Sequence, residues 1–199
     1  MNWQTLLAPL LIGVSLPVLA ATAGQSAPNF TLTDTQGKAV QLSDFKGRYV
    51  VLEWTNPQCP FVRNHYDTRN MQSLQETWGP RGVVWLSIDS SNKSSWSFMP
   101  PAKLEAWMHE KGAAQKAVLV DGESAVAKLY QAKTTPHMFV IDPEGRIVYA
   151  GAIDDRPSTR REDPPAAKNY VRAALTQATG GMAVTTANST PYGCSIDYY

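Results

Sequence analysis

Short apolar runs that alternate with segments of helical periodicity limit the fold of this chain more than any other feature of the sequence. Residues 49–54, 83–88 and 117–120 are rich in Val, Leu and Ile and nearly continuous in apolar character, which is typical of strands covered on both faces. Apolar residues recur at helical spacing over residues 60–78 and again around residues 104–108. Strands that alternate with helices predict a mostly parallel sheet with helices on both faces.

Further strands and helices surround this alternating core. Each predicted hairpin has a turn that contains Gly, and the closing helix is followed by two glycines. These elements are the hairpin of residues 30–42, the helix 124–130, the hairpin 138–150 and the helix 167–178. The length of 199 residues suits one domain. We therefore expect an α/β domain over residues 26–180, with a mixed sheet and an N-terminal β-hairpin extension, followed by a tail, 181–199.

The first 23 residues differ from everything that follows. An apolar run from Leu6 to Leu19 ends in small residues, as in a secretory signal peptide. No Lys or Arg precedes this run, and the first charged residue of the chain is Asp34, so an uncleaved membrane anchor is the alternative. We expect residues 1–23 to be a removed signal peptide, and the mature protein to be secreted or periplasmic without stable membrane insertion.

Cys59 is the residue on which the chemistry is expected to depend. It lies directly after the strand 49–54 and before a helix that begins at Pro60, so its sulfur is expected at a helix N-terminus, where backbone amides lack partners. These amides stabilise an anion by roughly 0.3–2 kcal/mol, which favours the thiolate, the nucleophilic form of cysteine. The alternative is a small buried cysteine without chemistry.

The second cysteine, Cys194, lies in the tail. In an exported chain both cysteines mature in an oxidising compartment, where a disulfide persists. The stretch from Gly181 to Cys194 reaches about 43–47 Å when extended, so distance does not prevent a bond to Cys59. The sequence leaves three alternatives open: a catalytic pair, a structural staple worth roughly 5 kcal/mol, or no bond.

Two further features point toward the same site. Glu53 is the one charged residue of the strand 49–54, and apolar surroundings should raise its pKa, which suits a general base for a thiol. The alternative is a carboxylate in solvent or paired with a lysine. A cis bond between Thr135 and Pro136 would place a sharp turn beside Cys59 and leave the backbone of Thr135 to pair with an extended thiol-bearing partner.

Other charged and titratable residues give weaker indications. Arg63 lies four residues after Cys59 on the same helix and either favours the thiolate or is simply solvated. The histidines have no metal-ligand spacing with each other or with the cysteines and are interpreted as surface or packing residues. They are His65, His109 and His137. We therefore expect no metal site and no cofactor.

A resemblance to the redoxin family rests on three stretches of the sequence. They are Glu53 to Val62, Thr135-Pro136 and Gly193-Cys194. This family includes thioredoxins and alkyl hydroperoxide reductase/thiol-specific antioxidant proteins, and the chain looks closest to its peroxiredoxin-like branch. The resemblance spans roughly residues 26–180. It implies a thioredoxin-like fold in which Cys59 is the nucleophile, Glu53 the buried acid and Pro136 the cis-proline opposite the site.

The sequence departs from the family pattern at two positions. Thioredoxins carry a second cysteine three residues after the first, where this chain has Val62, so a dithiol mechanism requires Cys194. A typical peroxiredoxin has threonine three residues before its cysteine, where this chain has Asn56. The residues expected to bind substrate are Thr55, Asn56, Pro60, Thr135 and Pro136.

Together these features predict an exported thiol-dependent oxidoreductase or antioxidant protein. Cys59 would reduce a peroxide or exchange with a protein disulfide, Cys194 would resolve the intermediate, and a thiol reductant would regenerate the pair. Glu53 would assist proton transfer. The alternative is a non-enzymatic binding or structural module stapled by Cys59 and Cys194. The net charge of +1 gives no general attraction to nucleic acid, so no nucleic-acid partner is expected.

Overall fold

Three parallel strands form the centre of the structure, a computed structural model that describes residues 21–198. They are β3 (Val50–Trp54), β4 (Val84–Asp89) and β5 (Ala117–Val120), and β4 lies between the other two. Every residue of β3 and β4 is buried. The prediction of central strands covered on both faces is therefore confirmed.

Antiparallel strands extend this centre on both sides, so the sheet is mixed. They are β1 (Thr31–Asp34) and β2 (Ala39–Gln41) beside β5, and β7 (His137–Ile141) and β8 (Ile147–Gly151) beside β3. The strand order is β2-β1-β5-β4-β3-β7-β8. Both predicted hairpins are confirmed, and the first one joins the sheet through β1. A separate two-stranded sheet pairs β6 (Thr134–Thr135) with β9 (Cys194–Ser195).

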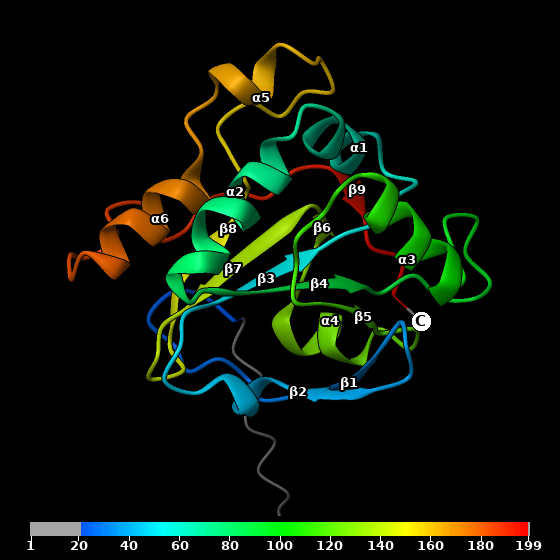
Figure 1. The fold of residues 1–199 in the computed structure, drawn as a ribbon, viewed down its shortest axis with the longest axis horizontal. Coiled ribbons are helices and arrows are strands. Elements are labelled where there is room, and N and C mark those ends of the chain that lie inside the picture. Colours follow the sequence, from blue (N-terminus) through cyan, green and yellow to red (C-terminus); the bar gives the residue numbers. More distant parts are fainter. Residues whose placement is uncertain (1–20, 199) are drawn as a thin grey trace, which may run out of the picture.

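Helices cover both faces of the sheet, as predicted (Figure 1). Each face has its own hydrophobic core. The larger helical layer consists of α1 (Pro60–Asp67), α2 (Asn70–Trp78), α3 (Pro101–Glu110) and α6 (Tyr170–Thr179). The opposite face is covered by α4 (Ala125–Tyr130) and the N-terminal segment. Short turns of helix are η1 (Leu42–Phe45), η2 (Gly79–Arg81) and α5 (Asp163–Ala166).

The single helix expected over residues 60–78 is wrong in one respect, because the structure divides it into α1 and α2. Arg69 between them has a left-handed backbone with a φ of 57°, which ends the first helix. The side chain of Gln72 donates to the carbonyl of Tyr66 at 2.9 Å and so supplies a hydrogen bond near the break. Both helices still bury one apolar face, so the sequence periodicity continues across it.

The C-terminal tail, expected as a polar extension, packs along the domain. Beside β8, the N–H of Ala150 donates to the carbonyl of Ala187 at 3.0 Å, and the N–H of Ser189 donates to that of Ala150 at 3.1 Å. The tail then continues as β9, and Figure 1 shows it in red running from the end of α6 across the molecule to the far side. The predicted boundary at residue 180 stays a prediction.

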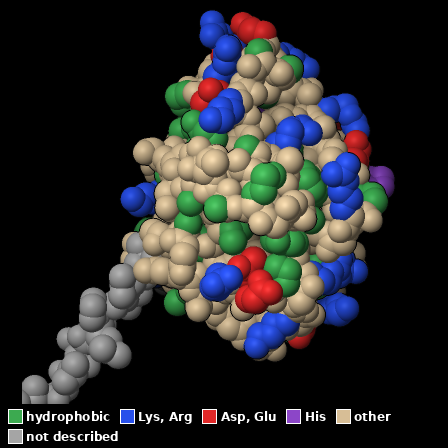
Figure 2. Space-filling view, turned by 90° about the vertical axis from the view of Figure 1, so that its left-hand side faces the viewer, with side chains coloured by type: hydrophobic (Ala, Val, Ile, Leu, Met, Phe, Trp, Pro, Cys, Tyr) green, Lys and Arg blue, Asp and Glu red, His purple; other side chains and the backbone are tan. Residues whose placement is uncertain are grey.

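Most of the expected signal peptide, residues 1–20, lies outside the described residues. Ala21 is buried against the core, and the N–H of Gly24 donates to the carbonyl of Ile147 at 2.8 Å. Over residues 21–198, no helix has both the length and the apolar character that crossing a membrane requires. Lys and Arg side chains are interspersed with Asp and Glu on the face shown in Figure 2.

Candidate active site

Cys59 closes the short turn between β3 and α1. Its N–H donates to the carbonyl of Asn56 at 3.0 Å, and its own carbonyl accepts from the N–H of Arg63 at 2.9 Å, so Cys59 is the N-cap of α1. Pro60 takes the first helical position, where the missing amide would have no helical partner. The predicted place of Cys59 at a helix N-terminus is therefore confirmed, and the residue is 2 % exposed.

Cys59 is bonded to Cys194, which is 135 residues away in the sequence and has its Cα 5.8 Å away. Cys194 begins β9 and lies opposite Thr135 of β6 in antiparallel register. Gly193 allows this close approach, since its φ is +130° and a Cβ there would lie 2.0 Å from the carbonyl oxygen of Thr135. Of the three alternatives left open by the sequence, the absence of a bond is therefore wrong, and both the catalytic pair and the structural staple agree with the bond.

The peptide bond between Thr135 and Pro136 is cis, as predicted. It brings the carbonyl oxygen of Thr135 to 3.0 Å from the sulfur of Cys59. The expectation that the backbone of Thr135 is open to a partner is wrong for this state, because Thr135 pairs with Cys194 of the same chain. The protein's own tail thus occupies the edge where we expected an extended partner.

Glu53 is completely buried in β3, beneath α1. Its Oε2 accepts from Nε1 of Trp85 (2.8 Å) and from the hydroxyl of Ser87 (3.0 Å), and its Oε1 accepts from the hydroxyl of Tyr66 (3.0 Å). Burial raises the pKa of the carboxyl, and these donors partly oppose that shift. The expected direction is confirmed, whereas the alternative of a solvated or lysine-paired carboxylate is wrong. Through Tyr66, Glu53 ties the central strand to the helix that follows Cys59.

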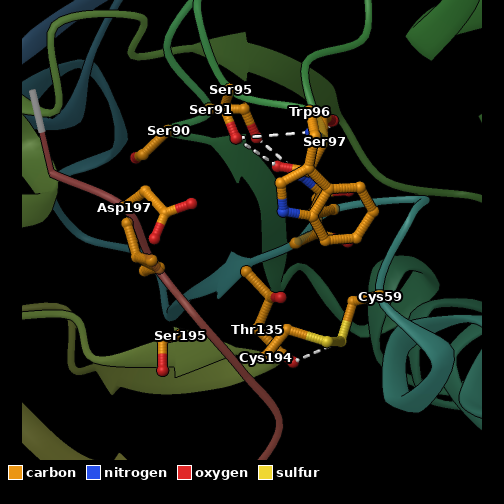
Figure 3. Close-up of a pocket in the computed structure, with 13 residues that line it drawn as sticks. Cys59, Ser90, Ser91, Ser95, Trp96, Ser97, Thr135, Cys194, Ser195 and Asp197 are labelled. Carbon is orange, nitrogen blue, oxygen red and sulfur yellow. Dashed lines mark hydrogen bonds between the residues drawn. A yellow bond between two sulfur atoms is a disulfide. The ribbon is translucent and has the colours of Figure 1, made fainter.

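A cleft of about 230 Å³ opens beside the disulfide. In Figure 3 the indole of Trp96 and several serines lie on one side of it, and the disulfide and the end of the tail lie on the other. Trp96 is 78 % exposed. The lining residues are Thr55, Asn56, Cys59, Ser90, Ser91, Ser95, Trp96, Ser97, Thr135, Cys194, Ser195, Ile196 and Asp197.

Three of the five predicted substrate-binding residues line this cleft. They are Thr55, Asn56 and Thr135, whereas Pro60 and Pro136 are not among its lining residues. Asn56 also shapes the site: its Oδ1 accepts from the N–H of Gln58 at 2.6 Å, and its Nδ2 donates to Ser91 at 2.5 Å and to the carbonyl of Ser97 at 3.3 Å. Asn56 therefore connects the turn that leads to Cys59 with residues 90–97 after β4, the serine loop.

The remaining sequence candidates lie apart from the sulfurs. Nε of Arg63 donates to the carbonyl of Pro57 at 2.6 Å, which supports the turn. His65 and His137 are buried, and burial lowers their pKa to about 4 and about 3, whereas His109 is exposed. Across residues 21–198 the structure has no group of His, Cys, Asp or Glu side chains suited to holding a metal ion.

A model of the AhpC/TSA family matches residues 23–150, which is more than half of the chain. The chain belongs to the AhpC/TSA family. The predicted redoxin resemblance is confirmed. The matched residues include Cys59, Glu53 and Pro136, and they end before the tail that carries Cys194.

Individual relatives of this AhpC/TSA-family chain agree with its fold. It is 29% identical to thiol-disulfide oxidoreductase ResA of Bacillus subtilis over 132 residues, 63% of this chain and 64% of that one. The match therefore spans less than two thirds of the relative's length. An uncharacterised conserved protein of Geobacillus kaustophilus superposes with a TM-score of 0.79 at 27% identity, covering 90% of this chain and 93% of the other.

The thioredoxin domain of a thiol-disulfide oxidoreductase from Bacteroides vulgatus has a TM-score of 0.53 at 22% identity, with 64% of this chain and 86% of that one covered. This likeness shows the fold alone, and the predicted thioredoxin-like fold is confirmed.

Sequence reasoning missed part of the site in this AhpC/TSA-family chain. No residue of the serine loop is among those predicted for the site, although the loop follows β4, the parallel neighbour of β3, and the carboxyl ends of adjacent parallel strands meet at one edge. That signal was available. Tyr192, which contacts His65 and Asp154 next to the disulfide, carried no signal of its own in a polar tail.

Proposed function

We propose that this protein is an exported thiol-disulfide oxidoreductase in which Cys59 and Cys194 are the reacting pair. The observation that carries the proposal is the disulfide between a cysteine at a helix N-terminus and a cysteine on a short, half-exposed strand of the tail. The name of the Bacillus subtilis relative, thiol-disulfide oxidoreductase, supports it, as does the thiol-specific antioxidant family.

The reaction needs only the groups of the pair and a partner. The thiolate of Cys59 attacks a partner disulfide, forms a mixed disulfide and releases one partner thiolate, which takes up a proton. The thiolate of Cys194 then attacks the sulfur of Cys59 and releases the second partner thiol. The partner disulfide gains two electrons and two protons, and the Cys59–Cys194 disulfide forms. The reverse sequence oxidises a partner dithiol.

Glu53 has a supporting part in this proposal. Its carboxyl is enclosed by Tyr66, Trp85 and Ser87, and it is not among the residues that line the cleft. It therefore acts by fixing the helix that follows Cys59, and any proton that it exchanges with the thiol has to pass through other groups.

The partner that fits this site best is an extended polypeptide with a thiol or disulfide. The carbonyl of Thr135 lies beside the sulfur of Cys59, and the edge of β6 already accepts a strand, which is β9. A partner strand has to replace β9. Among the described residues that line the cleft, Asp197 is the only charged one, which disfavours an anionic small thiol.

Peroxide reduction is the second candidate, and the cleft bordered by Thr55 and Asn56 favours it because a small molecule can reach Cys59 there. The Cys59 thiolate would attack a peroxide and become a sulfenic acid, releasing water or an alcohol. The Cys194 thiol would then condense with it, releasing water and forming the disulfide. A thiol reductant would restore both thiols.

Single-cysteine variants test the proposal. We expect Cys194→Ser to accumulate a mixed disulfide with a disulfide-bonded model peptide, detected by mass spectrometry, and Cys59→Ser to form none. Stopped-flow reaction of the reduced protein with hydrogen peroxide tests the second candidate, with sulfenic acid trapped in Cys194→Ser. If the Cys59 thiol reacts with neither substrate faster than free cysteine, both candidate functions are contradicted. The disulfide would then have only a structural role.

A further inference from the structure

The side chain of Tyr192 docks the tail beside the disulfide. Its hydroxyl donates to Oδ1 of Asp154 at 2.5 Å and lies 3.1 Å from Nε2 of His65. Its ring packs edge-on against Phe61, with the ring centroids 5.7 Å apart. Phe61 and His65 belong to α1, and Asp154 follows β8. Tyr192 therefore joins the tail to the same helix whose N-terminus carries Cys59.

The hydrogen bonds at Tyr192 form a directed chain. Nδ2 of Asn70 lies 2.9 Å from Nδ1 of His65 and can only donate, so the imidazole proton is on Nε2 and is donated to the tyrosine hydroxyl. Burial lowers the pKa of His65 to about 4, which keeps the ring neutral near pH 7. His65 is 0 % exposed and Asp154 is 2 % exposed. Loss of the Tyr192 hydroxyl would leave the Nε2 proton of His65 without this acceptor, and Oδ1 of Asp154 would keep the N–H of Arg156, which donates to it at 3.0 Å.

A second set of contacts holds the tail just before Tyr192. The hydroxyl of Ser189 accepts from the N–H of Ala152 at 2.9 Å and lies 2.6 Å from the hydroxyl of Tyr149. The N–H of Ser189 donates to the carbonyl of Ala150. Neither set of contacts involves a cysteine atom, so neither requires the disulfide bond itself.

The position of Tyr192 limits how far a reduced Cys194 can move. Two residues span at most about 7 Å of extended chain, so Cys194 stays close to Cys59 while Tyr192 is docked. If the Tyr192 contacts are lost while Ser189 stays bound, the five residues from Ser189 to Cys194 give Cys194 a reach of about 16–18 Å. The difference sets the effective concentration of one thiol at the other.

We propose that Tyr192 is a positioning residue for thiol-disulfide exchange, whose contacts with His65 and Asp154 keep Cys194 within reach of Cys59 after the disulfide is reduced. This inference rests on the proposed function. Tyr192 touches no reacting atom, and it acts on the step in which the Cys194 thiolate attacks the Cys59 sulfur of a mixed disulfide and displaces the partner thiolate. Tyr192 and Asp154 lie beyond the residues matched by the family model, whereas His65 lies within them.

The test is the equilibrium and rate of disulfide closure in the full chain with Tyr192→Phe. In glutathione redox buffers we expect the effective concentration of the pair, and the closing rate of the Cys59–glutathione mixed disulfide, to fall about tenfold to a hundredfold. Tyr130→Phe makes the same chemical change on α4, at the opposite face of the sheet, where the hydroxyl donates to the carbonyl of Pro28 at 2.7 Å, and should leave both values unchanged. In a Cys194→Ser background, Tyr192→Phe should not alter the attack of Cys59 on oxidised glutathione.

Hydrogen exchange gives a second measurement that does not depend on the reaction. In a Cys59→Ser/Cys194→Ser protein, which cannot form the bond, the Ser189 amide should stay protected, and adding Tyr192→Phe should weaken its protection. Closure within about twofold of the wild-type rate in Tyr192→Phe would overturn the positioning role. An unprotected tail in the disulfide-free protein would overturn it as well. A Cys194→Ser chain whose Cys59 forms no mixed disulfide with the disulfide-bonded peptide would instead overturn the proposed function.

Discussion

The two cysteines of the disulfide are held in opposite ways. Cys59 is 2 % exposed at the junction of β3 and α1, next to the completely buried Val62. Cys194 is half-buried in a two-residue strand, and most residues of the surrounding tail are at least partly exposed. Apolar packing fixes the first cysteine, whereas hydrogen bonds and close backbone contacts place the second.

This difference separates stability from reactivity in the molecule. The side that carries Cys59 lies within the residues matched by the family model, and its core stabilises the fold in either redox state. The tail lies outside the matched residues, and it brings a second thiol to the site. Changes on the first side should therefore alter the free energy of unfolding, and changes in the tail should alter disulfide chemistry.

The largest expected effect is on the core side. Leu74 of α2 is 0 % exposed, so Leu74→Ala should cost about 2–5 kcal/mol of the free energy of unfolding of the reduced protein. The matched tail variant, Ile196→Ala, removes a half-buried side chain and should cost less than about 1 kcal/mol. Urea unfolding with a reductant present measures both. Equal losses of the free energy of unfolding in the two variants would show that the tail contributes to stability as the core does.

Gly193→Ala should weaken the contact between the tail and β6 and leave the packing of the hydrophobic core unchanged. A Cβ at this position would lie 2.0 Å from the backbone oxygen of Thr135, so β9 must move away from β6. We expect the equilibrium constant for disulfide closure to fall about tenfold or more, in line with 1–3 kcal/mol of local strain. Redox titration with glutathione measures it.

Gly47→Ala is the matched control for this change. Gly47 also has a positive φ, +82°, but a Cβ there would meet nothing within 4 Å. Both variants share the cost of a left-handed alanine, and only Gly193→Ala adds the clash. If the two variants close the disulfide equally well, the close backbone contact between Gly193 and Thr135 does not control the equilibrium between the open and closed Cys59–Cys194 pair.

The difference between the Cys59 side and the tail also explains what the sequence could predict. The strands and amphipathic helices were predictable because burial imposes a short repeat on nearby residues, and the cysteine at the start of α1 follows from the same local pattern. The break at Arg69 was not, because a non-glycine residue adopts the left-handed conformation there while the apolar spacing continues. Apart from this break, local signals were sufficient on the Cys59 side.

The docking of the tail could not be read from local pattern. It depends on pairs far apart in the chain, such as Tyr192 with Asp154 and Gly193 with Thr135, and on polar contacts that leave no periodic trace. The cis bond before Pro136 was predictable because proline lowers its cost. Which strand would lie against that turn was not, and the answer is the chain's own β9.

Glu53→Gln should change the pH dependence of stability on the core side. Burial raises the pKa of Glu53 in the folded protein above its usual value of 4.5, so the folded state binds this proton more tightly than the unfolded state. The stability that protonation contributes is present at low pH and is lost as pH rises through the raised pKa. Wild type should therefore lose stability relative to Glu53→Gln from about pH 4.5 upward.

Urea unfolding from acidic to mildly basic pH measures this difference. Glu76→Gln on the exposed side of α2 serves as the control and should follow the wild-type profile. A constant difference between wild type and Glu53→Gln at every pH would contradict the prediction.

The smallest expected effect concerns Trp96, which faces the cleft from the serine loop and is 78 % exposed. Its removal exposes no core, so Trp96→Ala should leave the free energy of unfolding within about 0.5 kcal/mol of wild type. An indole across the cleft from the disulfide can cover a side chain of an extended partner, so exchange with a disulfide-bonded peptide should weaken about threefold to tenfold. Exchange with glutathione should be unchanged.

Met182→Ala alters another exposed side chain, outside the cleft, and should affect neither reaction. Equal losses with peptide and glutathione would mean that Trp96 acts on the disulfide itself. The serine loop would then belong, with the tail, to the part of the molecule that sets disulfide chemistry.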